Sequence, residues 1–304
     1  MSLKLTILGC HSAMPRASAH PTAQVLEIKN HTFLIDCGEG TQVRIRDNKI
    51  KFSKIKRIFI SHLHGDHVFG LIGLISTFRL LNNSTQLEIY GPKGIKKFIV
   101  TQLQLTESYA EFPIVFHELS SKNSELIFED DKITIHTIPL NHRIYTNGFL
   151  FKEKTGERKL NISEIKKYSE IEVCDYQNLK NGLNFNLTNG DIVPNKKLTL
   201  DPPKSLSYAF CSDTMYDEKI IPIIKGVDLL YHEATFLNDK IELTKTTKHS
   251  TAQQAAEIAK LANVNQLIIG HYSSRYSNIQ DFKIEASKIF PNTSLAVEGK
   301  IFTI

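Results

Sequence analysis

The most informative segment of this 304-residue chain reads Ile60-Ser61-His62-Leu63-His64-Gly65-Asp66-His67. A short β-branched run ends at Ile60, and three histidines and one aspartate follow directly. His62 and His64, two residues apart, can point the same way as the strand ends, and the turn at Gly65 lets Asp66 and His67 face a second point nearby. Imidazole nitrogens and carboxylate oxygens suit zinc, so this loop predicts ligands for two metal ions.

Three further candidate ligands follow later predicted strands. They are His142 in Pro-Leu-Asn-His, Asp213 in Cys-Ser-Asp-Thr and His271 in Ile-Gly-His-Tyr. A lone histidine is more often a core or surface residue than a ligand, so each of the three could be structural. Loops at strand ends are where α/β proteins place functional groups, and this shared position favours a metal site.

The pattern of apolar residues predicts many short strands and a few helices. The strands are expected at residues 4–8, 25–28, 32–35, 58–60, 87–90, 133–138, 208–211, 229–231, 266–269 and 294–297. The helices are expected at residues 68–81, 94–105, 251–262 and 281–290, with Ser250 or Thr251 as a cap for the third. Many early strands, followed by strands that alternate with helices, indicate an α/β fold with two sheets and helices outside them, a four-layer αββα sandwich.

Residues from about 152 to 204 differ in composition from the rest of the chain. They are polar, rich in Lys, Asn and Glu, and contain Lys-Asn-Gly, Thr-Asn-Gly and Asp-Pro-Pro. An excursion of this length inside a compact domain usually has a function or is disordered. We interpret it as an arm inserted into a single domain that spans residues 1–304.

Composition, charge and cysteine content say more about where the protein is located than about its activity. With 41% hydrophobic residues the chain can bury a core, and its formal net charge of +5 fits proteins that bind a polyanion and many that do not. The N-terminus does not resemble a signal peptide, and no stretch approaches the ~20 apolar residues that a membrane span needs. Four scattered cysteines without a Cys-x-x-Cys pair favour a reducing, cytoplasmic location.

The pattern His-x-His-x-Asp-His with three later ligands resembles the metallo-β-lactamase superfamily. The resemblance implies that one zinc ion is held by His62, His64 and His142, that the other is held by Asp66, His67 and His271, and that Asp213 bridges them. Two such cations can lower the pKa of a bound water and clamp both the attacking and the leaving oxygen of a phosphodiester.

The chemistry of phosphodiester hydrolysis then suggests roles for three residues. Asp66 is expected to be both a metal ligand and the acceptor that orients or deprotonates the attacking water. The departing ribose oxygen needs a proton, and His249, at a predicted helix start, is the candidate donor. Glu233, in the segment that follows another predicted strand, is expected to hold His249 in orientation.

The resemblance narrows to the ribonuclease Z family over nearly the whole chain. It is carried by residues 8–15, 35–42, 60–73 and 271–276, by His232-Glu233-Ala234-Thr235 and by His249-Ser250-Thr251. It implies an endoribonuclease that cuts precursor tRNA after the discriminator base and leaves a tRNA 3′-hydroxyl and a 5′-phosphate on the trailer. It also implies two zinc ions per subunit (with manganese or iron as alternatives), an arm that docks the tRNA elbow, and a homodimer.

Two segments depart from the family pattern. The family often has Pro-x-Lys-x-Arg-Asn, associated with rejecting tRNAs that already bear CCA, where this chain has Pro15-Arg16-Ala17-Ser18-Ala19-His20. The usual Gly-Pro of the arm is absent near Val173-Cys174-Asp175, although residues 176–180 resemble the next few residues of the family's arm. The sequence therefore leaves open the discrimination of CCA and the way in which the arm grips tRNA.

Three other interpretations fit parts of the pattern. The first is a phosphodiesterase of the same fold for small or cyclic substrates, which would not need the arm. The second is an iron-dependent dioxygenase or redox relative, because imidazole and carboxylate ligands also suit iron. The third is a non-catalytic RNA-binding subunit, although such proteins typically lose ligands and all seven positions are filled here.

Overall fold

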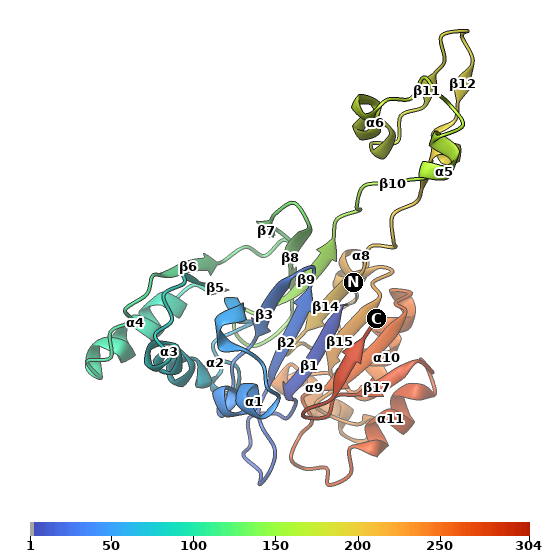
Figure 1. Cartoon of the computed structure of the whole chain (residues 1–304). Coiled ribbons are helices and arrows are strands. Elements are labelled where there is room, and N and C mark those ends of the chain that lie inside the picture. The colour runs from blue at the N-terminus through green and yellow to red at the C-terminus, as the bar shows by residue number, and fades with distance from the viewer. Residues whose placement is uncertain (1–2) are drawn as a thin grey trace. The chain divides into compact units, whose positions relative to one another are not determined.

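The computed structural model describes residues 3–304 and contains two large sheets (Figure 1). The strands of the first are β1 (Lys4–Gly9), β2 (Ala23–Ile28), β3 (His31–Ile35), β4 (Ile55–Phe59), β5 (Leu87–Pro92), β6 (Ile114–Leu119) and β18 (Ile301–Thr303). Those of the second are β7 (Leu126–Glu129), β8 (Ile133–Pro139), β9 (Asn147–Glu153), β14 (Ser207–Cys211), β15 (Leu229–Glu233), β16 (Gln266–Gly270) and β17 (Thr293–Leu295). Their spatial orders are β18-β1-β2-β3-β4-β5-β6 and β17-β16-β15-β14-β9-β8-β7.

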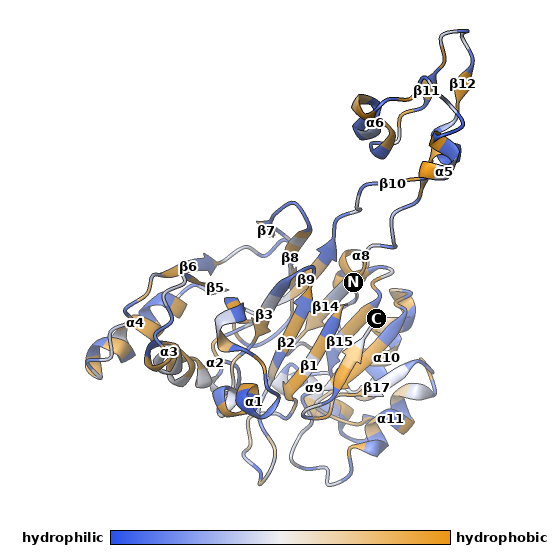
Figure 2. Ribbon diagram, viewed as in Figure 1, coloured by the Kyte–Doolittle hydropathy of each residue, from blue (hydrophilic) through white to orange (hydrophobic). Residues whose placement is uncertain are grey.

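Successive side chains of a strand point to opposite faces of its sheet. One face packs against the helices, and the other packs against the second sheet. Leu34 of β3 packs in one buried cluster with residues of α1 (Thr41–Asp47), α3 (Gly70–Leu80) and α4 (Ile95–Leu105). Its neighbour Phe33 faces the other way and contacts Phe151 of the second sheet, with ring centroids 5.4 Å apart. Helices α10 (Ala252–Leu261) and α11 (Gln280–Ser287) contact β15, β16 and β17, and Figure 2 shows apolar residues along the strands between these layers. The predicted αββα sandwich is confirmed.

Most predicted elements are present, with a few differences. Each predicted strand overlaps a strand of the structure, and Thr251 caps α10 in a capping box with Gln254. The helix predicted at residues 68–81 is instead two helices, α2 (Gly65–Val68) and α3, because the amide of Gly70 donates to the carbonyl oxygen of Cys37 (2.9 Å) and not to a carbonyl of the preceding helical turn. A Cβ atom at Gly70 would lie 2.0 Å from the carbonyl oxygen of Gly38, so this approach requires glycine. None of the helices in the described part of the chain has the length and apolar character that crossing a bilayer requires.

Strands β6, β7, β9 and β18 were not predicted. Strand β9 begins with Asn147-Gly148, a dipeptide typical of turns. Gly148 is needed there because a Cβ atom would lie 2.2 Å from the carbonyl oxygen of Phe210 in the paired strand β14. The backbone amide of Asn147 also donates to the carbonyl oxygen of Ser61 (3.0 Å), so β9 supports the histidine-rich loop.

Residues 130–133 and 153–205 form a compact second unit. Its elements are β10 (Lys159–Leu160), α5 (Ile162–Ile165), α6 (Tyr176–Lys180), β11 (Phe185–Asn186), β12 (Ile192–Val193), α7 (Asn195–Leu198) and β13 (Thr199–Leu200). Ile165, Leu179 and Leu198 pack together in its core. The buried Asn195 amide donates to the carbonyl oxygens of Leu179 and Leu183, both at 2.8 Å. The unit is therefore organised around its own small core.

Replacing Gly148 by alanine is expected to lower the free energy of unfolding by about 1–3 kcal/mol, because the added methyl group overpacks the β9–β14 pair. Thermal unfolding measures this loss as a lower melting temperature. Gly156→Ala is the matched control, since its Cβ atom would meet only Pro202 at 3.8 Å. Equal melting temperatures for the two variants would contradict the assigned role of Gly148.

Candidate active site

Candidate metal ligands from both sheets meet at one end of the sandwich. Four lie in the loop after β4 and in α2, and one lies in each of the loops after β8, β14 and β16. Two groups of donor atoms, each within 4.8 Å of one another, are His62, His64, His142 and Asp213, and Asp66, His67, Asp213 and His271. The structure thus brings together all seven residues that the sequence suggested as ligands.

The carboxylate of Asp213 lies between the two groups. Its Oδ2 is 3.5 Å from Nε2 of His62, whereas its Oδ1 is 3.3 Å from Nε2 of both His67 and His271. Nε2 of His62 and Nε2 of His67 are buried and have no hydrogen-bond partner within the described residues. Buried polar atoms are normally paired, so these two nitrogens fit coordination of a cation. The cluster therefore fits divalent metal ions.

Burial and charge set the protonation of these groups. Burial is the largest influence on His64 and His142 and lowers the pKa of each to about 4, so both rings are neutral at pH 7 and can coordinate. Burial alone would raise the pKa of Asp213, but His271 and His67 hold that pKa well below its usual range. His64, His142 and the carboxylates are thus in the forms that bind cations. Burial opposes the charging of His67, but Asp213, Asp66 and Asp36 raise its pKa well above its usual range, so that ring must lose a proton when a cation binds.

Asp36 orients the histidine-rich loop, a role that the sequence did not reveal. Its carboxylate accepts hydrogen bonds from the amide of Ser61 (2.7 Å), the hydroxyl of Ser61 (2.8 Å) and Nδ1 of His67 (2.7 Å). Because Ser61 Oγ donates to Asp36, it can accept from Nδ1 of His62 at 3.0 Å, which leaves Nε2 of that ring unprotonated. The available signal was the position of Asp36 directly after a predicted strand.

Two further candidate ligand histidines, His142 and His271, are held by the backbone and by a hydroxyl. Nδ1 of His142 donates to the carbonyl oxygen of Lys248 at 2.9 Å. Nδ1 of His271 donates to Oγ1 of Thr235 at 2.8 Å, and that hydroxyl donates to Glu233 at 2.8 Å. Both bonds fix the tautomer that leaves Nε2 free for a metal.

Glu233 and His249 form a buried pair beside the ligands. Oε1 of Glu233 accepts from Nδ1 of His249 (2.8 Å) and from the amide of Thr214 (3.0 Å), and Oε2 accepts two bonds from Thr235. Glu233, His249 and His271 could also be viewed as a third metal group. Because protein donors already occupy both oxygens of Glu233, we treat this set as a hydrogen-bonded pair next to His271. Burial opposes the charging of His249, but Glu233 and Asp213 raise its pKa to about 9.

Several side chains of this cluster line a cavity of about 650 Å³. His64, Asp66, Asp213, His249 and His271 contribute to its wall. Arg143 and Arg275 also line it, and the sequence had suggested a role for neither. Guanidinium groups beside metal-binding side chains suit a phosphate-containing substrate.

Known proteins are similar in sequence to this chain over almost its full length. Ribonuclease Z of Bacteroides thetaiotaomicron is 44% identical over 301 residues, which cover 99% of this chain and 95% of that protein. Ribonuclease Z of Phocaeicola vulgatus is 47% identical over 292 residues, which cover 96% of this chain and 94% of that protein. The family model described as Anti-Pycsar protein Apyc1 matches residues 3–155.

Solved structures agree with these relatives. The short form of human tRNase Z superposes with a TM-score of 0.72 at 26% identity and covers 98% of each chain. The metallo-β-lactamase fold protein YhfI of Bacillus subtilis superposes with a TM-score of 0.69 over 100% of each chain, and its 17% identity bears on the fold alone. The chain therefore belongs to the ribonuclease Z family with the metallo-β-lactamase fold, and its residues 3–155 also belong to the Anti-Pycsar protein Apyc1 family.

Proposed function

We propose that this chain is the endoribonuclease that hydrolyses the phosphodiester 3′ of the discriminator base in precursor tRNA. The products are a tRNA with a 3′-hydroxyl and a trailer with a 5′-phosphate. The proposal is carried by two donor groups that share Asp213 and lie beside the Glu233–His249 pair. That site lies in a chain that ribonuclease Z proteins match over nearly their full length.

We assign two zinc ions to the site, with manganese or iron as possible replacements. His62, His64 and His142 would hold one, Asp66, His67 and His271 would hold the other, and Asp213 would contact both. Bound divalent cations supply a water of lowered pKa and stabilise negative charge on the phosphate.

The chain's own side chains supply the proton transfers. Asp66 lies 3.4 Å from Nε2 of His67 and 3.3 Å from Nε2 of His271, and its carboxylate would accept a hydrogen bond from the attacking water and so orient or deprotonate it. His249 donates a proton from Nε2 to the departing ribose 3′-oxygen, while Glu233 holds its Nδ1. Only 8% of His249 is exposed, and its ring lines the cavity described above.

Family membership supports the remaining proposals. We propose that the second unit is the tRNA-binding arm inserted in a single metallo-β-lactamase domain, and that two chains form a homodimer in which each arm serves the partner's active site. All four cysteines are free thiols, and three are buried, which supports action in the reducing cytoplasm.

End-mapping of the products of a labelled precursor tRNA, with and without CCA, tests both the cut position and the rejection of tRNAs that bear CCA.

A second candidate is hydrolysis of a small or cyclic phosphodiester by the same cluster. The match of residues 3–155 to another family supports keeping it, because that segment includes His62, His64 and His142 but lacks residues 156–205, which make up most of the second unit. The two functions differ in their need for the arm.

Asp213→Ala is expected to abolish cleavage and to lower the metal content, because both donor groups lose a shared ligand.

His249→Ala should slow cleavage by about 10²–10⁴-fold while the metal content stays unchanged. Elemental analysis and single-turnover cleavage of precursor tRNA measure the two effects, and His136→Ala on β8 is the matched control. Loss of metal from the His249 variant would contradict its assignment as proton donor.

Glu233→Gln is expected to move the alkaline limb of the cleavage pH profile to lower pH by about 1–3 units. His249 must be protonated to act as the acid, so activity falls as pH rises through its pKa. Removing the Glu233 carboxylate lowers that pKa, whereas Glu242→Gln on the surface should leave the profile unchanged. Bound cations lower the pKa in both enzymes, so the difference between them is the measurement. An unmoved limb would mean that another group titrates.

Replacing residues 154–204 by a short flexible linker is expected to abolish cleavage of precursor tRNA and to spare turnover of a small aromatic phosphodiester. The reason is that all proposed ligands lie outside this segment. Adding inactive Asp66→Ala protein should partly restore precursor cleavage if arms act across a dimer. Full precursor cleavage by the shortened protein would contradict the role of the arm. Turnover of the small diester without precursor cleavage by the full-length protein would favour the small-diester enzyme.

A further inference from the structure

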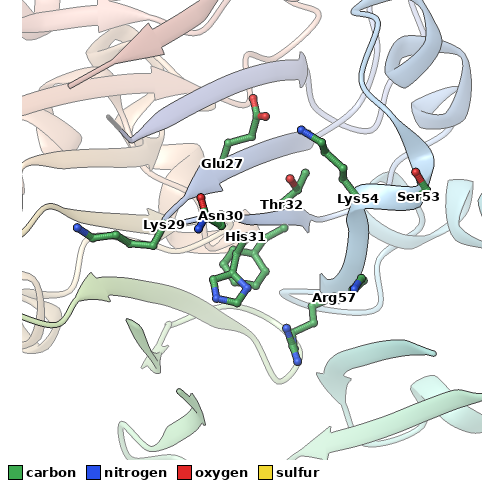
Figure 3. A pocket seen from close by; sticks show the side chains of 10 residues that line it. Glu27, Lys29, Asn30, His31, Thr32, Ser53, Lys54 and Arg57 are labelled. Atoms are coloured by element: carbon green, nitrogen blue, oxygen red, sulfur yellow. The ribbon is translucent and has the colours of Figure 1, made fainter. Parts of the chain in front are cut away.

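A second cavity, of about 860 Å³, lies at the opposite end of strands β2–β4 from the proposed metal ligands. It is formed where β2 ends and where β3 and β4 begin, whereas the histidine-rich loop follows the last residue of β4. Lys29, Lys54, Lys56 and Arg57 line it together with neutral polar residues (Figure 3). We call this cavity the basic cleft.

Two positive charges of the basic cleft have no counter-ion. Lys54 and Lys56 are exposed and take part in no ion pair among residues 3–304. The carboxylate of Glu27 also lines the cleft, but it is paired with Lys4 at 2.8 Å. Arg57 contacts Glu88 at 2.8 Å, so its charge is partly compensated. The uncompensated ammonium groups make the cleft attractive to anions.

The positions of the cations indicate an extended anion. In Figure 3, Lys54 and Arg57 extend to different sides of β3 and do not point at one centre. The pairing of β3 with β4 shifts register between Thr32 and Phe33, which leaves Lys56 as an extra residue in β4. Such bulges redirect side chains. A single phosphate needs converging donors, whereas separated cations fit successive phosphates of a nucleic acid backbone.

We propose that the basic cleft binds the phosphodiester backbone of the RNA substrate in a part of the molecule that is not being cut. This proposal rests on the proposed function. The hydroxyls of Thr32 and Ser53 and the amide of Asn30 add neutral donors beside the lysines. Backbone contacts of this kind supply affinity and carry no sequence information, as an enzyme acting on many tRNAs requires.

The test uses full-length, metal-loaded protein with Lys54→Gln and Lys56→Gln together. Binding of precursor tRNA is measured in a His249→Ala background, which keeps all the proposed metal ligands and cuts the RNA slowly, from about 50 to 200 mM salt. We expect binding roughly tenfold or more weaker at the low-salt end and a slope of log affinity against log salt that is smaller by about 2. Turnover of a small phosphodiester by the otherwise wild-type double variant should not change.

Lys283→Gln with Lys288→Gln is the matched control, because both lysines are exposed on or next to α11 and the net charge changes equally. An unchanged salt slope in the cleft variant, or an equal change in the control, would overturn the basic cleft as an RNA site. An acidic protein partner would give that unchanged slope. Failure of the wild-type protein to cut precursor tRNA would instead overturn the proposed function, whatever the cleft variant does.

Discussion

The shared position of Asp213 constrains much of this molecule. Only 2% of this residue is exposed, and an ionised carboxylate at such a depth is costly unless cations or donors surround it. The histidine nitrogens nearest to it come from the loop after β4 in the first sheet and from His271 after β16 in the second, and they would share a bound cation with it. Both sheets must therefore end at the same level. The aromatic contacts between them, such as Phe59 with Phe149, keep the sheets packed together.

The site also contains backbone conformations that cost stability. Asp36 and His271 have φ angles of 55° and 64°, in the left-handed region where residues other than glycine pay about 1–3 kcal/mol. Buried hydrogen bonds compensate, since the amide of Asp36 donates to Phe59 at 2.8 Å and the amide of His271 donates to Cys10 at 2.7 Å. Both residues directly follow strands. The left-handed conformation turns the backbone out of the sheet at each of the two residues, so that its side chain reaches the cluster.

Strand ends made much of this site predictable from the sequence. His142, Asp213 and His271 each follow an apolar run, which made them candidates, and the resemblance to a known metal-binding pattern then selected them. Asp36 also follows such a run, but its role depends on hydrogen bonds to residues 25 and 31 positions away, which no local pattern reveals. Asn195 was equally hidden, because a buried amide inside a polar segment looks like a surface residue.

The helix and strand differences have the same origin in tertiary contacts. The apolar run at residues 68–81 reads as one helix because its periodicity continues through Gly70. The break follows from the hydrogen bond of the Gly70 amide to Cys37, and the nearby backbone of Gly38 requires glycine at this position. Gly148 likewise looks like part of a turn until Phe210 is placed beside it. In both cases close approach of two backbones selects glycine, and residues distant in sequence decide the local structure.

The candidate metal site and the basic cleft place their charged side chains differently. Bond cleavage needs side chains that converge on one point, whereas affinity for a polyanion needs only positive charges at suitable spacing. This division explains how a chain with a net charge of only +5 can be suited to a large RNA.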